Sequence, residues 1–386
     1  MAEIRDLTDD EARRALLKWG AAEPDVLPAW VAEMDYALAP PVHDALRQAV
    51  EDQVTGYPPF PTEGYGGTAG RALQEAYAGF AERQFGHLVA PEHVLPVVDV
   101  TAGVRFVLDV LSGPGAVVFP LPGYPPQHDI AQVTGRERAD LVLDPDAERA
   151  EIDLGRLDAL LAAGAETLLL TQPHNPWGRV FTRAELEGIR DVVVRHGARV
   201  VSDEIHAPLV LDGHEHVSYL SIEGTADHAV AVTAASKAFN TPGLRCAQIV
   251  TGDEATMRRL LAAPMARNDS WSPLGVIAAT AAFRDGDAWL TALRARLSAQ
   301  RDLLARLLAE HLPGARMRPL EATYLAWLDL RAYHDDPAGV ALQHARVWVQ
   351  DGRMFQPDLP GHVRLNIATS PERLTEIVRR MAAALA

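Results

Sequence analysis

The central part of the chain, residues 94 to 250, alternates short apolar stretches with amphipathic segments. Residues 94–100 and 167–170 are runs of apolar and β-branched side chains, which is typical of buried strands. Helix signals stand between such runs, for example a capping box made by Thr182 and Glu185. Strands that alternate with helices require right-handed crossovers and produce a parallel sheet covered by helices. The sequence therefore predicts an α/β fold with a large, mainly parallel sheet.

The C-terminal part of the chain has a different pattern. Residues 288–312 have the apolar periodicity of one long helix, and residues 323–329 and 363–367 alternate like half-buried strands. These segments predict a smaller α+β domain, with the start of the chain packed beside it. The expected division is an N-terminal segment, a large domain and a small C-terminal domain: residues 1–50, 51–287 and 288–386.

Charge and cysteine content exclude several classes of function. The chain carries 52 acidic and 36 basic side chains, a net charge of −16, so it lacks the basic surface expected of a protein that binds nucleic acid or an anionic membrane. The one cysteine, Cys246, excludes an intramolecular disulfide and a cysteine-rich metal site. With no secretory signal and no long uncharged apolar stretch, we expect a cytoplasmic protein that acts on small molecules.

Reactive side chains follow three of the predicted strands. Asn175, Asp203 and Lys237 are 28 and then 34 residues apart, about one strand and one crossover each. Ligands of such sheets gather outside the carboxyl ends of the strands, so we expect the three side chains to converge. Lys237 alone could be a strand-end lysine that reaches water. If Lys237 lies beside Asn175 and Asp203, it is a candidate for a desolvated, nucleophilic amine.

Two further features suit a flat, phosphorylated ligand. Thr101 is placed to cap a helix after the strand 94–100, and the turn at Ala102 and Gly103 would then present free N–H groups to a phosphate. Tyr124 lies in a proline-rich loop, where it could stack on a planar ring or only pack against the prolines. Together with the strand-end groups, these are the elements needed to hold pyridoxal 5′-phosphate.

The chain resembles the fold-type I pyridoxal-phosphate enzymes of the class I/II aminotransferase superfamily. The resemblance covers residues 19 to 370 and implies a seven-stranded type of sheet, a homodimer with shared active sites and an amino-acid substrate. The matching motifs are Gly103 in its turn, Pro122-Gly123-Tyr124, His174-Asn175-Pro176-Trp177-Gly178-Arg179, Ser202-Asp203-Glu204-Ile205-His206, Ser236-Lys237-Ala238-Phe239-Asn240, Gly243-Leu244-Arg245 and Arg364-Leu365-Asn366.

Other motifs are similar to those of the MalY/PatB branch, whose members are carbon–sulfur β-lyases that act on cystathionine, cysteine or cysteine conjugates. Because the branch also includes aminotransferases, an aminotransferase is the alternative that the resemblance leaves open. The motifs are Lys18-Trp19, Leu27-Pro28-Ala29-Trp30-Val31-Ala32-Glu33-Met34-Asp35-Tyr36, Gly56-Tyr57, Asp203-Glu204-Ile205-His206 and Thr323-Tyr324-Leu325-Ala326-Trp327-Leu328-Asp329.

The resemblance also implies a role for each matching residue. Lys237 would form the Schiff base and take the substrate's Cα proton. Asp203 would pair with the ring nitrogen, Asn175 with the ring hydroxyl, and Tyr124 would stack on the ring. The phosphate would be held by backbone and side-chain donors: Gly103, Val104, Ser236 and Arg245.

Three residues are expected to act on the substrate or across the dimer. Arg364 would bind the substrate carboxylate, and Tyr57 would reach the phosphate in the neighbouring subunit's site. Trp177 replaces a commoner residue and would shape the substrate pocket. Ala234 stands where relatives often place a phosphate-binding hydroxyl, so Ser236 and its neighbours would carry more of that load.

The histidines have simpler interpretations. His206 is expected to be a packing residue, or to help orient Asp203. His214 and His216 flank Glu215 in a polar turn with no third ligand, which favours a solvated loop over a metal site.

Overall fold

The structure, a computed structural model, describes residues 3–58 and 71–385. Its largest element is a seven-stranded sheet in the order β2-β8-β7-β6-β5-β3-β4. Neighbouring strands are parallel except for the two pairs that involve β8, so the predicted mainly parallel sheet is confirmed. The strands are β2 (Val94–Val97), β3 (Ala116–Leu121), β4 (Arg138–Val142), β5 (Ala165–Thr171), β6 (Arg199–Asp203), β7 (Ala229–Thr233) and β8 (Ala247–Thr251).

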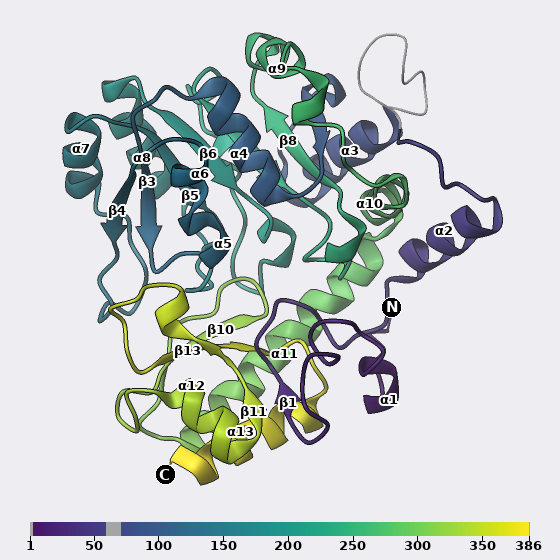
Figure 1. Ribbon diagram of the computed structural model, residues 1–386, viewed down its shortest axis with the longest axis vertical. Coiled ribbons are helices and arrows are strands. Elements are labelled where there is room, and N and C mark those ends of the chain that lie inside the picture. Colours follow the sequence, from purple (N-terminus) through teal and green to yellow (C-terminus); the bar gives the residue numbers. More distant parts are fainter. Residues whose placement is uncertain (1–2, 59–70, 386) are drawn as a thin grey trace.

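Helices cover both faces of this sheet (Figure 1). Successive residues of a strand point to opposite faces, so Val200 packs into the core beneath α7 and α8, whereas Val201 packs into the core beneath α4 and α9. The capping box of Thr182 and Glu185 is formed at the start of α8. The covering helices are α4 (Val100–Leu111), α5 (Pro125–His128), α6 (Ile130–Val133), α7 (Leu154–Ala162), α8 (Arg183–His196) and α9 (Glu254–Leu261).

A smaller antiparallel sheet, in the order β12-β13-β10-β9, lies below the large one in Figure 1. Its strands are β9 (Arg316–Met317), β10 (Leu325–Asp329), β12 (Gln350–Asp351) and β13 (His362–Asn366). It is accompanied by α12 (Pro337–Val340), α13 (Pro371–Leu385) and the long α11 (Asp287–His311), against which α13 packs. The predicted smaller α+β unit is thus present.

The start of the chain divides between the two units. β1 (Leu27–Pro28) pairs with β11 (Val347–Trp348) beside the small sheet, and the short α1 (Asp9–Ala12) contacts the start of α13 through an ion pair between Asp9 and Arg373. However, α2 (Pro40–Glu51) packs against α10 (Pro273–Asp285), which also contacts α3 (Ala72–Phe85). The segment that accompanies the small unit therefore ends before residue 40 and not at residue 50.

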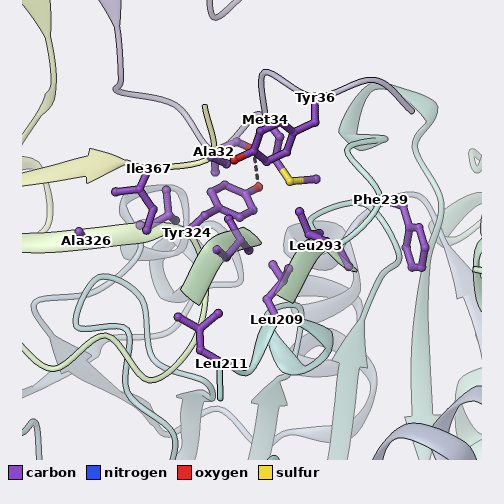
Figure 2. Packing of buried hydrophobic residues seen from close by; sticks show 14 of the residues in the cluster. Ala32, Met34, Tyr36, Leu209, Leu211, Phe239, Leu293, Tyr324, Ala326 and Ile367 are labelled. Carbon is purple, nitrogen blue, oxygen red and sulfur yellow. Dashed lines mark hydrogen bonds between the residues drawn. The ribbon is translucent and has the colours of Figure 1, made fainter. Parts of the chain in front are cut away.

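Side chains from all three parts of the chain share one core. Figure 2 shows Met34 and Tyr36 of the N-terminal segment beside Tyr324 of the small unit and Leu209 of the large unit, all of which are buried. This shared packing fixes residues 29–36 against both units. Within the described residues, no helix is both long enough and apolar enough to cross a membrane.

Candidate active site

A cavity of about 180 Å³ opens at the carboxyl edge of the large sheet. Asn175, Asp203 and Lys237 all line it, as the spacing of the strands predicted. The N-terminal segment and β13 close its other side. The lining residues are Ala32, Val98, Asp99, Val100, Thr101, Tyr124, Thr171, Asn175, Asp203, Ile205, His206, Ala234, Ser236, Lys237, Pro242, Arg245, Cys246 and Arg364.

Lys237 follows β7 and points its amine into this cavity. Its Nζ donates a hydrogen bond to the backbone oxygen of Ala32, 3.2 Å away. Burial, and then the nearby Arg364 guanidinium, lower the pKa of the Lys237 amine to about 8, although Glu33 and Asp203 oppose the shift. A substantial fraction of the amine is therefore unprotonated, and nucleophilic, slightly above neutral pH.

Asp203 ends β6 and is buried. Gln127 Nε2 donates to its Oδ2 at 2.6 Å, and the Ile205 N–H donates to its Oδ1 at 3.1 Å. Burial is the largest influence and raises the pKa of the carboxyl to about 6. A protonated ring nitrogen placed against this carboxylate would offset the cost of its burial. Gln127, on the short helix α5, had no signal in the sequence.

Arg364, on β13, is a buried cation at the opposite side of the cavity. Its Nη1 donates to Asn175 Oδ1 at 3.1 Å and its Nη2 to the Trp30 carbonyl oxygen at 3.1 Å, while the guanidinium lies 4.7 Å from the centre of the Phe355 ring. Burial lowers its pKa only to about 10, so it stays charged at neutral pH. No carboxylate of the described residues pairs with it, and its Nε has no partner there. Such a group suits an anionic ligand.

The phosphate-binding turn lies at the start of α4, but not where the sequence placed it. Asp99, and not Thr101, is the N-cap: its side chain accepts the Ala102 N–H at 2.7 Å. The first two helical residues, Val100 and Thr101, line the cavity, and their N–H groups have no acceptor within the helix. The prediction that Gly103 supplies a donor is wrong, because its N–H is bound to the Asp99 carbonyl oxygen.

Val104 is likewise ruled out as a phosphate donor, since it lies in the second turn of α4 and is fully buried. Gly103 has a packing role instead: a Cβ there would lie 2.8 Å from Val232 Cγ1, so glycine lets α4 approach β7 closely. Ser236 and Arg245 do line the cavity beside the helix start. Arg245 forms an ion pair with Asp99 at 2.7 Å.

Two other predicted site residues lie outside the cavity. Trp177 is buried against Leu143 and Ala150, and the Arg318 guanidinium covers its ring at 4.9 Å, so the expectation that Trp177 shapes the substrate pocket is wrong. Tyr57 is 94% exposed and contacts no part of the cavity of its own chain. A role for it in a neighbouring subunit stays a prediction.

His206 is closer to the chemistry than the sequence suggested. It is buried, lines the cavity, and its Nδ1 has no hydrogen-bond partner among the described residues. Burial, followed by the charges of Lys237 and Arg364, lowers its pKa to about 3, so it is a neutral imidazole that can still donate or accept one hydrogen bond. Tyr124 and Ile205 line the cavity as well.

The loop after His206 is not fully solvated either. His216 is buried and its Nε2 lies 3.1 Å from the Glu204 carboxylate, which also accepts from the Gln172 side chain at 3.1 Å. The described residues contain no cluster of three or more metal ligands. Gln172 and Glu204 thus join the ends of β5 and β6, the strands that carry Asn175 and Asp203.

These groups fit pyridoxal phosphate. The cavity is lined by a buried carboxylate, free helix N–H groups beside a hydroxyl and a guanidinium, an aromatic side chain and a lysine amine. His206, a neutral imidazole, is one more polar side chain in its lining. Asp99 places a carboxylate beside the helix start, and its ion pair with Arg245 at 2.7 Å offsets that negative charge.

Known proteins are similar to this chain over nearly its whole length. The family model for aminotransferase class I and II matches residues 39–381. The cystathionine beta-lyase of Corynebacterium glutamicum is 36% identical over 375 residues, which are 96% of this chain and 97% of that protein. The cystathionine beta-lyase PatB of Bacillus subtilis is 31% identical over 370 residues, covering 94% and 93% of the two chains.

Among solved structures, one from Corynebacterium diphtheriae, described as a candidate PLP-dependent beta-cystathionase, has a TM-score of 0.91 and 34% identity and covers 99% of both chains. The family model and the relatives above 30% identity all extend over both the large and the small unit. This chain therefore belongs to the aminotransferase class I and II family, among the relatives of the cystathionine beta-lyase PatB.

Proposed function

We propose that this protein is a pyridoxal-phosphate-dependent carbon–sulfur β-lyase, which converts cystathionine, cysteine or a cysteine S-conjugate into a thiol, pyruvate and ammonia. The observation that carries the proposal is the meeting of Lys237, Asp203 and Arg364 in one cavity. Two full-length relatives named cystathionine beta-lyase support the choice of substrate class.

The cofactor, when bound, supplies an electron sink for the carbanion formed at the substrate's Cα. Asp203 would keep the ring nitrogen protonated, and Tyr124 would stack on the ring. Lys237 would hold the cofactor covalently and, once displaced by the substrate amine, take the Cα proton on its Nζ. The phosphate would bind the N–H groups of Val100 and Thr101 with help from the Ser236 hydroxyl and the Arg245 guanidinium: a set shifted from the one that the sequence predicted.

Arg364 would bind the α-carboxylate of the substrate through its guanidinium group. We expect Arg364→Lys to raise KM for cystathionine roughly tenfold to a hundredfold while kcat changes by less than about threefold, because a lysine keeps the charge but loses the bidentate geometry. Steady-state kinetics at saturating cofactor measures both constants. An unchanged KM would exclude Arg364 as the carboxylate-binding group.

An aminotransferase is the second candidate, because it would use the same side chains and differ only in where the carbanion is protonated. Incubation with L-cystathionine, L-cysteine and an S-aryl-cysteine, with and without a 2-oxo acid, separates the two. The lyase releases pyruvate and thiol without any acceptor. Turnover that requires the 2-oxo acid would favour the aminotransferase.

We also propose a cytoplasmic homodimer in which Tyr57 completes the neighbouring subunit's site. Large apolar side chains are exposed near it in sequence, including Val50 at 64% and Val54 at 39%, and the lone Cys246 is a buried free thiol. A second copy of the chain packed on this surface would bury them.

Mixed dimers test this arrangement. When a Tyr57→Phe subunit pairs with a Lys237→Ala subunit, one of the two sites has both an intact lysine and an intact tyrosine. We expect the mixture, after exchange of subunits, to recover roughly a quarter of wild-type activity, above the mean of the separate variants. A mixture no more active than that mean would show that Tyr57 does not act in the other subunit's site.

A further inference from the structure

Residues 30–34 run between the two units without regular hydrogen-bonded structure, and side chains hold their backbone instead. Each of the five successive carbonyl oxygens accepts a hydrogen bond from a side chain distant in the sequence. The donors are Arg364 to Trp30 (3.1 Å), Asn366 to Val31 (2.7 Å), Lys237 and Tyr324 to Ala32 (3.2 and 3.1 Å), Lys18 and Asn366 to Glu33 (3.1 and 2.7 Å), and Asn240 to Met34 (2.9 Å).

Both lysines of the chain take part in this set. Only Lys18 and Lys237 are lysines among the 36 basic side chains, and they donate to the adjacent carbonyls of Glu33 and Ala32. Lys18 is buried and forms an ion pair with Asp35 at 2.9 Å. Lys237 has no ion-pair partner among the described residues, and the Ala32 oxygen is the hydrogen-bond acceptor that it has there.

The Ala32 carbonyl is held in place from both sides. The amide of Asn366 donates to the carbonyls before and after it, at Val31 and Glu33, which leaves the Ala32 oxygen for Lys237 and Tyr324. Figure 2 shows the buried Tyr324 side chain directed at Ala32, with its hydroxyl on the same oxygen. One carbonyl oxygen therefore serves two donors, one structural and one reactive.

We infer that the Ala32 carbonyl positions the amine of Lys237 in the cavity whenever that amine is not covalently engaged, and that Tyr324, which shares the oxygen, limits how strongly it does so. One N–H of the amine donated to Ala32 leaves the nitrogen lone pair free to face the reacting carbon. Tyr324 and Asn366 are then positioning residues that act through a backbone group. The inference rests on the proposed function for the role of Lys237 as the base.

The pKa of the Lys237 amine depends on this hydrogen bond and on the charged groups around the amine. Arg364 and burial disfavour the ammonium form, while Asp203 and Glu33 favour it; His206, also close, is neutral. A hydrogen bond from the ammonium to Ala32 favours the charged form further. Weakening that bond lowers the midpoint of Lys237, and strengthening it raises the midpoint.

The test is a pH titration of the full-length protein, freed of cofactor and labelled with carbon-13 at the lysine side chains. With two lysines, two signals are expected, and we expect the Lys237 signal to titrate near pH 8. Replacing Glu33 by its α-hydroxy acid analogue turns the Ala32–Glu33 amide into an ester, whose carbonyl is a weaker acceptor. We expect the Lys237 midpoint to fall by about half a pH unit or more.

Two further variants make the test specific. An ester at the next bond, Glu33–Met34, weakens the acceptor of Lys18 and should leave the Lys237 midpoint unchanged. Tyr324→Phe leaves the Ala32 oxygen to Lys237 alone and should raise the midpoint, which a loss of packing would not do. An unmoved midpoint in the Ala32–Glu33 ester, or a lowered one in Tyr324→Phe, would overturn the inference. Since no substrate is present, the result does not depend on which reaction the enzyme catalyses.

Discussion

Replacing Lys237 by alanine will reduce thiol release from cystathionine at least about ten-thousand-fold, because the variant loses both the group that holds the cofactor and the base for the Cα proton. The loss is large because the two functions share one Nζ atom, and the only other lysine in the sequence, Lys18, is buried in an ion pair with Asp35. The measurement is initial-rate thiol release at saturating pyridoxal phosphate, with wild type assayed in parallel.

A chemical control accompanies this variant. Borohydride reduction should fix the cofactor permanently to the peptide that contains Lys237 in the wild type, and to no peptide in Lys237→Ala. Thermal unfolding of the two proteins without cofactor should be similar, which would show that the fold is intact. Cofactor fixed to Lys18, or a rate of Lys237→Ala within tenfold of wild type, would show that Lys237 is not the residue that holds the cofactor and takes the Cα proton.

Asp203→Asn will lower catalytic activity but raise the stability of the protein without cofactor. We expect it to lower kcat/KM about a hundredfold to a thousandfold, because an amide cannot keep the ring nitrogen protonated and the electron sink is weakened. In the protein without cofactor the same change should be stabilising, since the buried carboxylate has its pKa raised to about 6. Gln127 can turn its amide to pair with the new asparagine.

The sign of the stability effect follows from the raised pKa. Between about pH 4 and 6 the folded protein binds more protons than the unfolded chain. The free energy of unfolding of the wild-type protein therefore falls as pH rises through that window. Above it the penalty is constant, and Asp203→Asn should be more stable by about 1 to 3 kcal/mol at pH 8. Denaturant unfolding at pH 4 and pH 8 measures this: the gain should be present at pH 8 and nearly absent at pH 4. A gain of equal size at both values would contradict the assigned pKa.

The strand pattern was enough to bring three candidate side chains together in one cavity. Asn175, Asp203 and Lys237 each follow an apolar run, and parallel strands bring such positions to one edge, so their spacing was enough to place them together. The capping box that starts α8 was equally visible, because its two residues are local in sequence.

The sequence could not locate features that depend on contacts with residues far away in the sequence. Both Asp99 and Thr101 can cap a helix. In the structure Asp99 is the N-cap, and it also forms an ion pair with Arg245, which is far away in the sequence. The phosphate donors therefore lie closer to the helix start than the sequence predicted. Trp177 had the size of a pocket residue, but the Arg318 guanidinium covers its ring. The Ala32 carbonyl had no signal at all, because backbone groups carry none in the sequence.

We propose that removal of the Cα proton by Lys237 leads to loss of the substrate's β-thiolate, and not to transfer of its amino group to the cofactor. A single turnover decides it: protein with bound cofactor is mixed with a stoichiometric amount of L-cystathionine, with no 2-oxo acid, and thiol, pyruvate, ammonia and the form of the released cofactor are measured together. The β-lyase predicts equal amounts of thiol, pyruvate and ammonia, with all of the cofactor recovered as pyridoxal phosphate. Recovery of pyridoxamine phosphate, with the carbon–sulfur bond of the substrate intact, would contradict it.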